Sequence, residues 1–443
     1  MMSEISETQI LDWHAKHAWQ PFTQMKLAPN PEVITSAEGI YLKTQDGRKI
    51  IDGVGSWWVS IHGHNHPYIM EAIRKQTETL DQVMYAGFTH EPAARLSHRL
   101  AQSTGYALPR VFFSDNGACA VEIALKMAFQ YFTNQGRPEK SRFVTLDRGY
   151  HGDTIGTMAA GARSAFHKVY EPLLFSVLTS PTPAPDPGAV DFVISDESVS
   201  QCVAALRSLF ETRGHEICGL ILEPLIQGAD GMNMYPAEFL TEARKLCNTY
   251  DIFLIADEVF TGFGRTGTFY ACEAAGIWPD IMPISKGLSA GAVALGATLA
   301  SERVYEGFLS NERSHTLFHG HSMTGNPIGC AAANASMDLM NPECFDQIST
   351  LALAHVRNLS SLQASRSSVR RTRSLGSVAA FDLKSERAAS PDFSQKFRER
   401  CVQKGLLVRP LGSVIYLCPP YVVSIQELDR IYDILNETIK EFE

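Results

Sequence analysis

The sequence has 443 residues and a formal net charge of −9; 45% of the residues are hydrophobic and 20% are charged. These proportions are those of a folded globular protein and exclude a disordered chain. The densest basic stretch, Arg366–Arg373, is too short to follow a phosphate backbone, which argues against a nucleic-acid partner. The longest apolar run is far shorter than a membrane span, and the first twenty residues hold acids but no apolar core. We therefore expect a cytoplasmic protein with no membrane partner.

Residues 1–65 are predicted to form an N-terminal arm that contributes to a small domain. The segment Tyr41–Gly53 alternates about Asp46-Gly47 in the manner of a β-hairpin. Trp57 and Trp58 follow this hairpin, and two adjacent residues cannot share one side of a strand. One ring is therefore expected to pack inward while the other lines a cavity, with plain packing of both as the alternative.

Two motifs resemble a metal site and a dinucleotide-binding site, but the residues around them argue against both functions. His62, His64 and His66 alternate as metal ligands on a strand would, but the Gly and Pro residues between them indicate a loop, so we expect no metal site. Residues 262–267 match G-x-G-x-x-G, yet no amphipathic helix follows them, as a dinucleotide site would require.

Residues 66–330 alternate between strand-like and helix-like segments, which predicts an α/β domain with a mostly parallel sheet and helices on both faces. The Pro-rich stretch Val177–Pro187 is expected to be irregular. Residues 331–443 are expected to form a smaller α+β domain with two helices. In the large domain, strands are predicted at Arg110–Phe113, Phe143–Leu146, Cys218–Leu222, Ile252–Ala256 and Asp280–Ile284, and helices at Ala93–Gln102, Ala120–Phe132, Val199–Thr212, Pro236–Asn248 and Ile328–Met340.

Two of these strands deliver a carboxylate and an amine to the same edge of the sheet. Asp257 follows Ile252–Ala256, and Lys286 follows Asp280–Ile284. Ligands collect at the carboxyl ends of strands in such sheets. The apolar run after Lys286 predicts a desolvated, nucleophilic amine, and an Asp partner is what the pyridine nitrogen of pyridoxal phosphate (PLP) requires. The alternative at this point is that both side chains are solvated or paired with each other.

Three further segments carry candidate ligands. Residues 114–118 form a polar turn before a helix, where free N–H groups can bind an anion, although such turns are common. Tyr150 follows a strand and is placed to cover a planar ring or simply to pack. Arg409 follows a strand-like run and is a candidate clamp for a substrate carboxylate, with a surface salt bridge as the alternative.

With these pieces in place, the chain resembles the class III (subgroup II) aminotransferases of the fold-type I PLP enzymes over nearly its whole length. The runs that carry the resemblance are ADEVFTGFGRTG followed by SKG, together with GSWWVSIHGHNHP, YHGDTIGTMA, EPLIQGADGM and RPLGSVIYLCPPY. The resemblance implies a homodimer with its active sites at the interface.

The resemblance also implies a role for individual residues. Lys286 matches the lysine that holds PLP and shuttles a proton, Asp257 the partner of the pyridine nitrogen, and Tyr150 the residue against the ring. Asn116, Gly117 and Ala118 match the phosphate site, to which Ser322 of the neighbouring subunit contributes a hydroxyl. The substrate pocket is implied to hold Phe22, Trp57, Trp58, Gly320, Arg409 and Tyr416.

Five positions depart from the family pattern. Asn116 and Ala118 stand where serines are common, which leaves more of the phosphate binding to the backbone. Ser322 replaces threonine but keeps a hydroxyl, and His321 before it stands where proline is often found. Phe22 stands where tyrosine is usual, and the missing hydroxyl bears on the choice of amino donor.

The activity that the resemblance implies is a transamination in biotin synthesis, in which 7-keto-8-aminopelargonate accepts the amino group of S-adenosylmethionine. Lysine as donor is one alternative, and another class III ω-aminotransferase activity is a second. A PLP-binding protein without turnover is a third.

Overall fold

A seven-stranded sheet organises the larger part of the chain. The computed structural model describes residues 5–163, 167–186 and 188–443. The strand order is β4-β12-β11-β10-β7-β5-β6. All neighbours run parallel except β12, which is antiparallel to both β11 and β4. The strands are β4 (Arg110–Ser114), β5 (Arg142–Leu146), β6 (Leu178–Ser180), β7 (Ile217–Leu222), β10 (Phe253–Ala256), β11 (Ile281–Ile284) and β12 (Gly296–Ala300). The predicted mostly parallel α/β sheet is confirmed.

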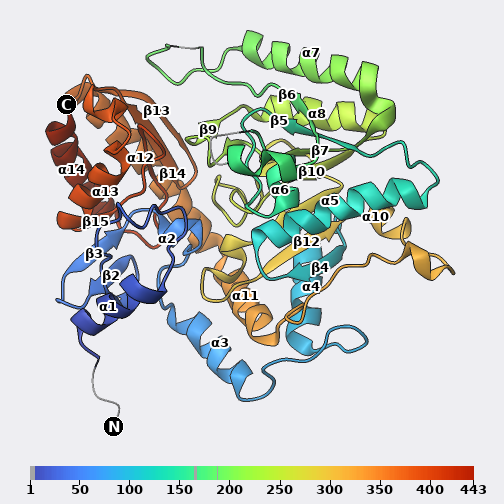
Figure 1. Ribbon diagram of the computed structural model, residues 1–443, viewed down its shortest axis with the longest axis horizontal. Helices are drawn as coiled ribbons and strands as arrows, with labels where there is room; N and C mark the ends of the chain where they lie inside the picture. Colours follow the sequence, from blue (N-terminus) through green and yellow to red (C-terminus); the bar gives the residue numbers. More distant parts are fainter. Residues whose placement is uncertain (1–4, 164–166, 187) are drawn as a thin grey trace.

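Helices cover both faces of this sheet because its strands are buried on both sides (Figure 1). One face packs on α5, through alternate residues of β7, β10 and β11. The other face packs on α7 and α8 toward β7 and β10, and on α3, α4 and α11 toward β11 and β12. The helices of this part are α3 (Pro67–Thr77), α4 (Glu91–Ser103), α5 (Gly117–Asn134), α6 (Ile155–Ala160), α7 (Asp196–Arg213), α8 (Ala237–Thr249), α9 (Ala271–Ala274), α10 (Glu302–Glu306) and α11 (Pro327–Leu339).

The two ends of the chain come together in a smaller unit. The strand β15 (Leu406–Leu407) pairs in parallel with β3 (Lys49–Asp52), and this extends the N-terminal sheet β1 (Ile34–Glu38), β2 (Tyr41–Thr44) and β3 (Figure 1). The predicted hairpin is thus formed by β2 and β3. A second sheet, β13-β14-β16, lies nearby. Its strands, and the helices of this unit, are β13 (Val369–Leu375), β14 (Val378–Leu383), β16 (Val414–Leu417), α1 (Glu7–His17), α12 (Pro342–Ser365), α13 (Phe393–Gln403) and α14 (Ile425–Phe442).

Two predictions about these elements are wrong. The Pro-rich stretch is not wholly irregular, since Leu178–Ser180 forms β6 at the edge of the sheet. Its prolines begin only at Pro181, after the ladder ends. The C-terminal part also holds three long helices rather than two, because α12 runs for 24 residues. The division at residues 65 and 330 stays a prediction, and α11 runs through the second boundary while packing on α3 and α4.

Within the described ranges, no helix combines the length and the apolar character needed to span a bilayer.

Candidate active site

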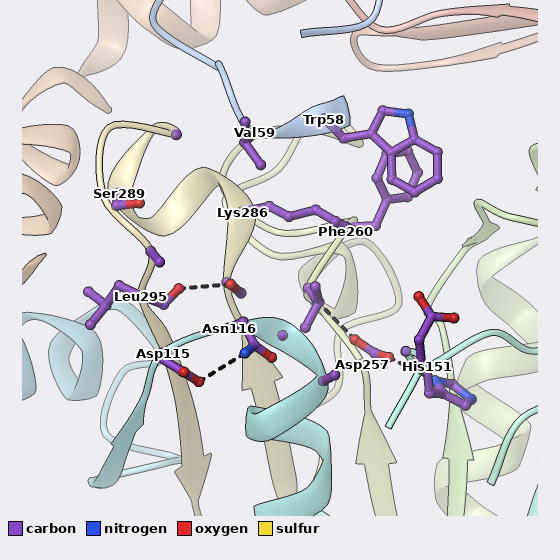
Figure 2. Close-up of a pocket in the computed structure, with 18 of the residues that line it drawn as sticks. Trp58, Val59, Asp115, Asn116, His151, Asp257, Phe260, Lys286, Ser289 and Leu295 are labelled. Atoms are coloured by element: carbon purple, nitrogen blue, oxygen red, sulfur yellow. Dashed lines mark hydrogen bonds and ion pairs between the residues drawn. The ribbon is translucent and has the colours of Figure 1, made fainter. Parts of the chain in front are cut away.

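The carboxyl ends of the strands surround a cavity of about 700 Å³ (Figure 2). Asp257 follows β10, Lys286 follows β11, and Glu223 follows β7. Tyr150 and His151 lie in the loop after β5, and the N-terminus of α5 closes another side. The structure therefore brings together residues that are far apart in the sequence, because parallel strands end at one edge of the sheet.

Lys286 lines the cavity and is partly buried. Its backbone has a φ of 43°, a left-handed conformation that is rare for a residue with a side chain. Its Nζ lies 4.6 Å from the ring centroid of Trp58 and 5.5 Å from that of Phe260, and Figure 2 shows the side chain pointing toward both rings. Burial lowers the pKa of Lys286 to about 8, against the opposing effects of Asp257 and Glu223. The amine is thus available as a nucleophile or base near neutral pH.

Asp257 also lines the cavity and is paired with a histidine. Its Oδ2 lies 2.7 Å from Nδ1 of His151, and its Oδ1 accepts a hydrogen bond from the Val259 N–H at 3.1 Å. Both side chains are nearly inaccessible to solvent. The other ring nitrogen of His151 has no partner within the described residues. This arrangement fixes a buried carboxylate toward the cavity, where it can pair with a protonated ring nitrogen.

Glu223 also lines the cavity and anchors the loop that carries Tyr150. Its carboxylate accepts hydrogen bonds from the Tyr150 N–H at 3.0 Å and the Gly228 N–H at 2.9 Å. Burial raises the pKa of Glu223 to about 7. The Tyr150 hydroxyl donates to Asp153 at 2.9 Å, and burial raises the pKa of Tyr150 well above its usual value. The aromatic ring is therefore held at the cavity by both its backbone and its hydroxyl.

The N-terminus of α5 provides an anion site at the other end of the cavity. Asn116 is the N-cap, and its side-chain oxygen accepts from the Cys119 N–H at 2.9 Å. The N–H groups of Gly117 and Ala118 begin the helix and line the cavity. A Cβ on Gly117 would lie 2.6 Å from Cγ1 of Val259, so this position is closely packed. The Asn116 side chain thus caps the helix, as a serine there could also do.

A second group of predicted residues forms an aromatic wall. Trp58 is 5% exposed and lines the cavity, whereas Trp57 is 38% exposed. The Arg409 guanidinium lies 3.7 Å from the ring centroid of Trp57 and 5.7 Å from that of Phe22. Burial lowers the pKa of Arg409, and no salt bridge to it is found among the described residues. Its cation is therefore oriented by stacking rather than by a carboxylate.

Tyr416 lies behind Trp58, with 5.9 Å between the ring centroids. Burial raises the pKa of Tyr416 above its usual value. The nearby Trp58 indole acts in the opposite direction and lowers the pKa of Tyr416. The indole N–H and the Tyr416 hydroxyl do not form a hydrogen bond, and neither has another partner within the described chain.

The two tryptophans lie on an unusual turn. The four residues of α2 (Gly55–Trp58) have φ values of 56°, 45°, 68° and 74°, so this turn is a left-handed helix. Each residue with a side chain in that conformation costs roughly 1 to 2 kcal/mol. Strain of this kind persists only where the surrounding structure imposes it, and it is concentrated at functional sites.

Six predicted site residues do not line the cavity of this chain. Gly320 and Ser322 are exposed. Phe22, Trp57 and Arg409 lie in the aromatic wall, and Tyr416 lies behind Trp58. Conversely, His151, Glu223 and Phe260 line the cavity but were not singled out from the sequence. His151 and Glu223 stood next to a candidate residue or at a strand end, which was a usable signal, whereas the ring of Phe260 gave none.

Comparisons with known proteins agree with this geometry. A family model described as class III aminotransferase matches residues 24–439. An adenosylmethionine-8-amino-7-oxononanoate aminotransferase of Synechococcus elongatus is 45% identical, with 96% of this chain and 99% of the relative covered. A protein of the same name from Geobacter sulfurreducens is 40% identical, with 98% of each chain covered.

Solved structures give the same result. The enzyme of that name from Methanocaldococcus jannaschii has a TM-score of 0.91 and 33% identity, covering 99% of this chain and all of the other. An amine transaminase from an uncultivated Pseudomonas species, solved with PLP bound, has a TM-score of 0.90 and 31% identity, covering 96% of this chain and 98% of the other. The predicted fold-type I architecture is thus confirmed, and the chain belongs to the class III aminotransferase family.

Proposed function

We propose that this chain is a PLP-dependent transaminase of biotin synthesis, which transfers the amino group of S-adenosylmethionine to 8-amino-7-oxononanoate (7-keto-8-aminopelargonate). The observation that carries the proposal is the make-up of the cavity, which Lys286, Asp257, Tyr150 and the N-terminus of α5 line together. The relatives from Synechococcus and Geobacter, named for this reaction and aligned over nearly their whole length, support the choice of substrates.

The residues around the cavity fit this cofactor. The N–H groups of Gly117 and Ala118 at the start of α5 suit its phosphate, and glycine suits position 117 because a Cβ there would lie 2.6 Å from Cγ1 of Val259. Asp257 suits its ring nitrogen, and His151 holds the Asp257 carboxylate in place. Lys286 is the only lysine that lines the cavity among the described residues, so it is the residue proposed to hold the cofactor covalently.

When bound, PLP supplies an electron sink that stabilises negative charge on the carbon bearing the amino group. The chain supplies the proton transfer. Nζ of Lys286 is the proposed base, because a pKa of about 8 leaves a substantial neutral fraction at physiological pH. The Trp58 and Phe260 rings flank this amine and reduce its contact with water.

Arg409 is proposed to bind the substrate carboxylate. Its guanidinium is held flat on Trp57 and has no carboxylate partner in the described chain, so its donors remain available for a bidentate contact. Tyr416 and Trp58 are proposed to contact the substrate through their buried polar atoms. Phe22 contributes only its ring to this wall, since the chain lacks a hydroxyl there.

We also propose a homodimer in the cytoplasm, in which Ser322 and Gly320 complete the site of the neighbouring subunit. Exposed apolar side chains on the arm and on two loops support this assembly, because large apolar side chains exposed together mark protein contacts. They are Trp13, Trp19, Leu27, Met84, Phe88, Phe318 and Met323.

The test is formation of product from purified, PLP-loaded protein. With 8-amino-7-oxononanoate and S-adenosylmethionine, we expect 7,8-diaminononanoate, detected by mass spectrometry, and none from Lys286→Ala. Product formed with lysine or glutamate but not with S-adenosylmethionine would contradict the proposed donor. Turnover by Lys286→Ala at the wild-type rate would contradict the proposed role of the lysine.

A further inference from the structure

The left-handed turn α2 is closed by hydrogen bonds that are normal in length. The Trp58 N–H donates to the Val54 carbonyl and the Val59 N–H to the Gly55 carbonyl, both at 2.9 Å. Ser56, Trp57 and Trp58 nevertheless have conformations that L-residues avoid. These two bonds would form equally well in a right-handed turn, so they do not explain its handedness. Contacts from outside the turn must impose it.

A buried carboxylate supplies contacts of this kind. Asp52, at the end of β3, is inaccessible to solvent. Its Oδ1 accepts from the Val54 N–H at 3.2 Å, and its Oδ2 accepts from the Ser56 hydroxyl at 2.8 Å. Nε2 of His64 lies 2.9 Å from the same Oδ2. The carboxylate thus ties the start of the turn to its second residue and to a loop further along the chain.

The His64 end of this cluster is itself fixed to the N-terminal sheet. The His64 N–H donates to the Gly39 carbonyl at 2.7 Å, and the Gly39 N–H donates back to the His64 carbonyl at 3.2 Å. The far end of the turn is fixed by Arg265, whose Nη2 donates to the Trp58 carbonyl at 2.6 Å. The turn is therefore held at both ends, with Asp52 as the contact at its start.

We propose that Asp52, Ser56 and His64, here called the Asp52 cluster, are positioning residues for the transamination site. None of them lines the main cavity. They act through the turn, whose third residue, Trp57, carries the Arg409 guanidinium and whose fourth, Trp58, covers the Lys286 amine. If the turn relaxes, the carboxylate-binding cation and the cover over the lysine both move.

Four variants test this. Asp52→Ala removes all three contacts, and Ser56→Ala removes only the contact to the second residue of the turn. Asp52→Asn is the conservative rescue: its Oδ1 still accepts from the Val54 N–H, and its amide can donate to the Ser56 hydroxyl and to Nε2 of His64. Ser60→Ala is the matched control. Ser60 lines the same 200 Å³ side cavity as Ser56 and His64 and is 3% exposed, but its hydroxyl has no partner within the described residues.

Two readouts separate positioning from general stability. The first is near-ultraviolet circular dichroism of the cofactor-free protein, which reports the packing of Trp58 against Phe260 and Tyr416. The second is steady-state kinetics, well below the melting temperature, with the carboxylate-bearing acceptor. For Ser56→Ala and Asp52→Ala we expect an altered tryptophan signal and a KM raised about tenfold or more, because small misplacements of binding groups are costly. Asp52→Asn and Ser60→Ala should stay within about threefold of wild type.

The kinetic arm rests on the proposed function for its substrate, whereas the circular dichroism arm does not. If the wild type failed to use the acceptor, the proposed function would fall while the tryptophan signal still tested the cluster. A wild-type tryptophan signal and KM in Ser56→Ala would overturn the inference, and so would a Ser60→Ala variant as impaired as Ser56→Ala. If Asp52→Ala fails to fold, Ser56→Ala and Asp52→Asn still decide the matter.

Discussion

Replacing Lys286 by methionine should stabilise the cofactor-free protein at neutral pH. A lysine whose pKa falls from 10.5 to about 8 on folding corresponds to about 3 kcal/mol, at roughly 1.36 kcal/mol for each tenfold change in proton affinity. Below pH 8 the folded protein holds an ammonium in an apolar site, whereas the unfolded chain solvates it freely. The lysine therefore lowers the free energy of unfolding most below pH 8. This destabilisation decreases as the pH rises from 8 to 10.5 and is absent above that range.

The expected change in melting temperature follows from the length of the chain. At about 2.1 cal/mol/K per residue, unfolding 443 residues carries an entropy of about 0.9 kcal/mol/K, so 3 kcal/mol corresponds to about 3 °C. Differential scanning fluorimetry of cofactor-free Lys286→Met and wild type should show this gain at pH 7, and little of it at pH 10.

A second buried lysine provides a control with the opposite sign. Lys140 is 2% exposed, but its Nζ donates to the carbonyls of Ile217, Tyr250 and Asp251, so Lys140→Met leaves these acceptors unpaired and should lower the melting temperature. A Lys286→Met protein that melts at a lower temperature than wild type at pH 7 would refute the reasoning. A gain in melting temperature that is the same at pH 7 and pH 10 would also refute it.

Three other substitutions have defined outcomes. Gly117→Ala should raise the dissociation constant for PLP by about tenfold or more in an absorbance titration, because the new Cβ would lie 2.6 Å from Val259. The control Gly214→Ala, whose Cβ would meet only ordinary contacts, should leave the dissociation constant unchanged. Arg409→Lys should raise the KM of the carboxylate substrate about tenfold with a smaller effect on kcat, since it loses the planar stack and fork; an unchanged KM would remove Arg409 from the substrate site. Asp257→Asn should slow the half-reaction with the amino donor by about a hundredfold or more in stopped-flow absorbance, because a neutral amide replaces the buried charge.

The sequence predicted those parts of the molecule that depend on local pattern. The runs that form β10 and β11 are short, apolar and bounded by polar residues, so the delivery of Asp257 and Lys286 to one edge of the sheet could be inferred. The desolvation of Lys286 also followed from the apolar run after it. The role suggested for each residue came from the family resemblance and remains a proposal.

The features that escaped prediction depend on contacts between distant segments. The strand β13 is rich in arginine and overlaps the densest basic stretch of the sequence, whose role the sequence did not indicate. Its Arg373 is in fact buried, with its donors directed to the carbonyls of Gly231 and Met232 in the other unit. The pairing of His151 with Asp257 joins residues 106 positions apart. The left-handed turn was also not predicted, and one of the contacts that hold it comes from Arg265, 207 positions along the chain from Trp58.

The most direct test of the central claim is the visible absorbance of purified, PLP-loaded protein mixed separately with S-adenosylmethionine, lysine and glutamate. The account predicts that S-adenosylmethionine alone discharges the band of the lysine-bound cofactor, which would also make Phe22 a tolerated replacement. Loss of the band with lysine or glutamate instead would contradict the proposed donor, and a band that no amine discharges would contradict transamination by this site.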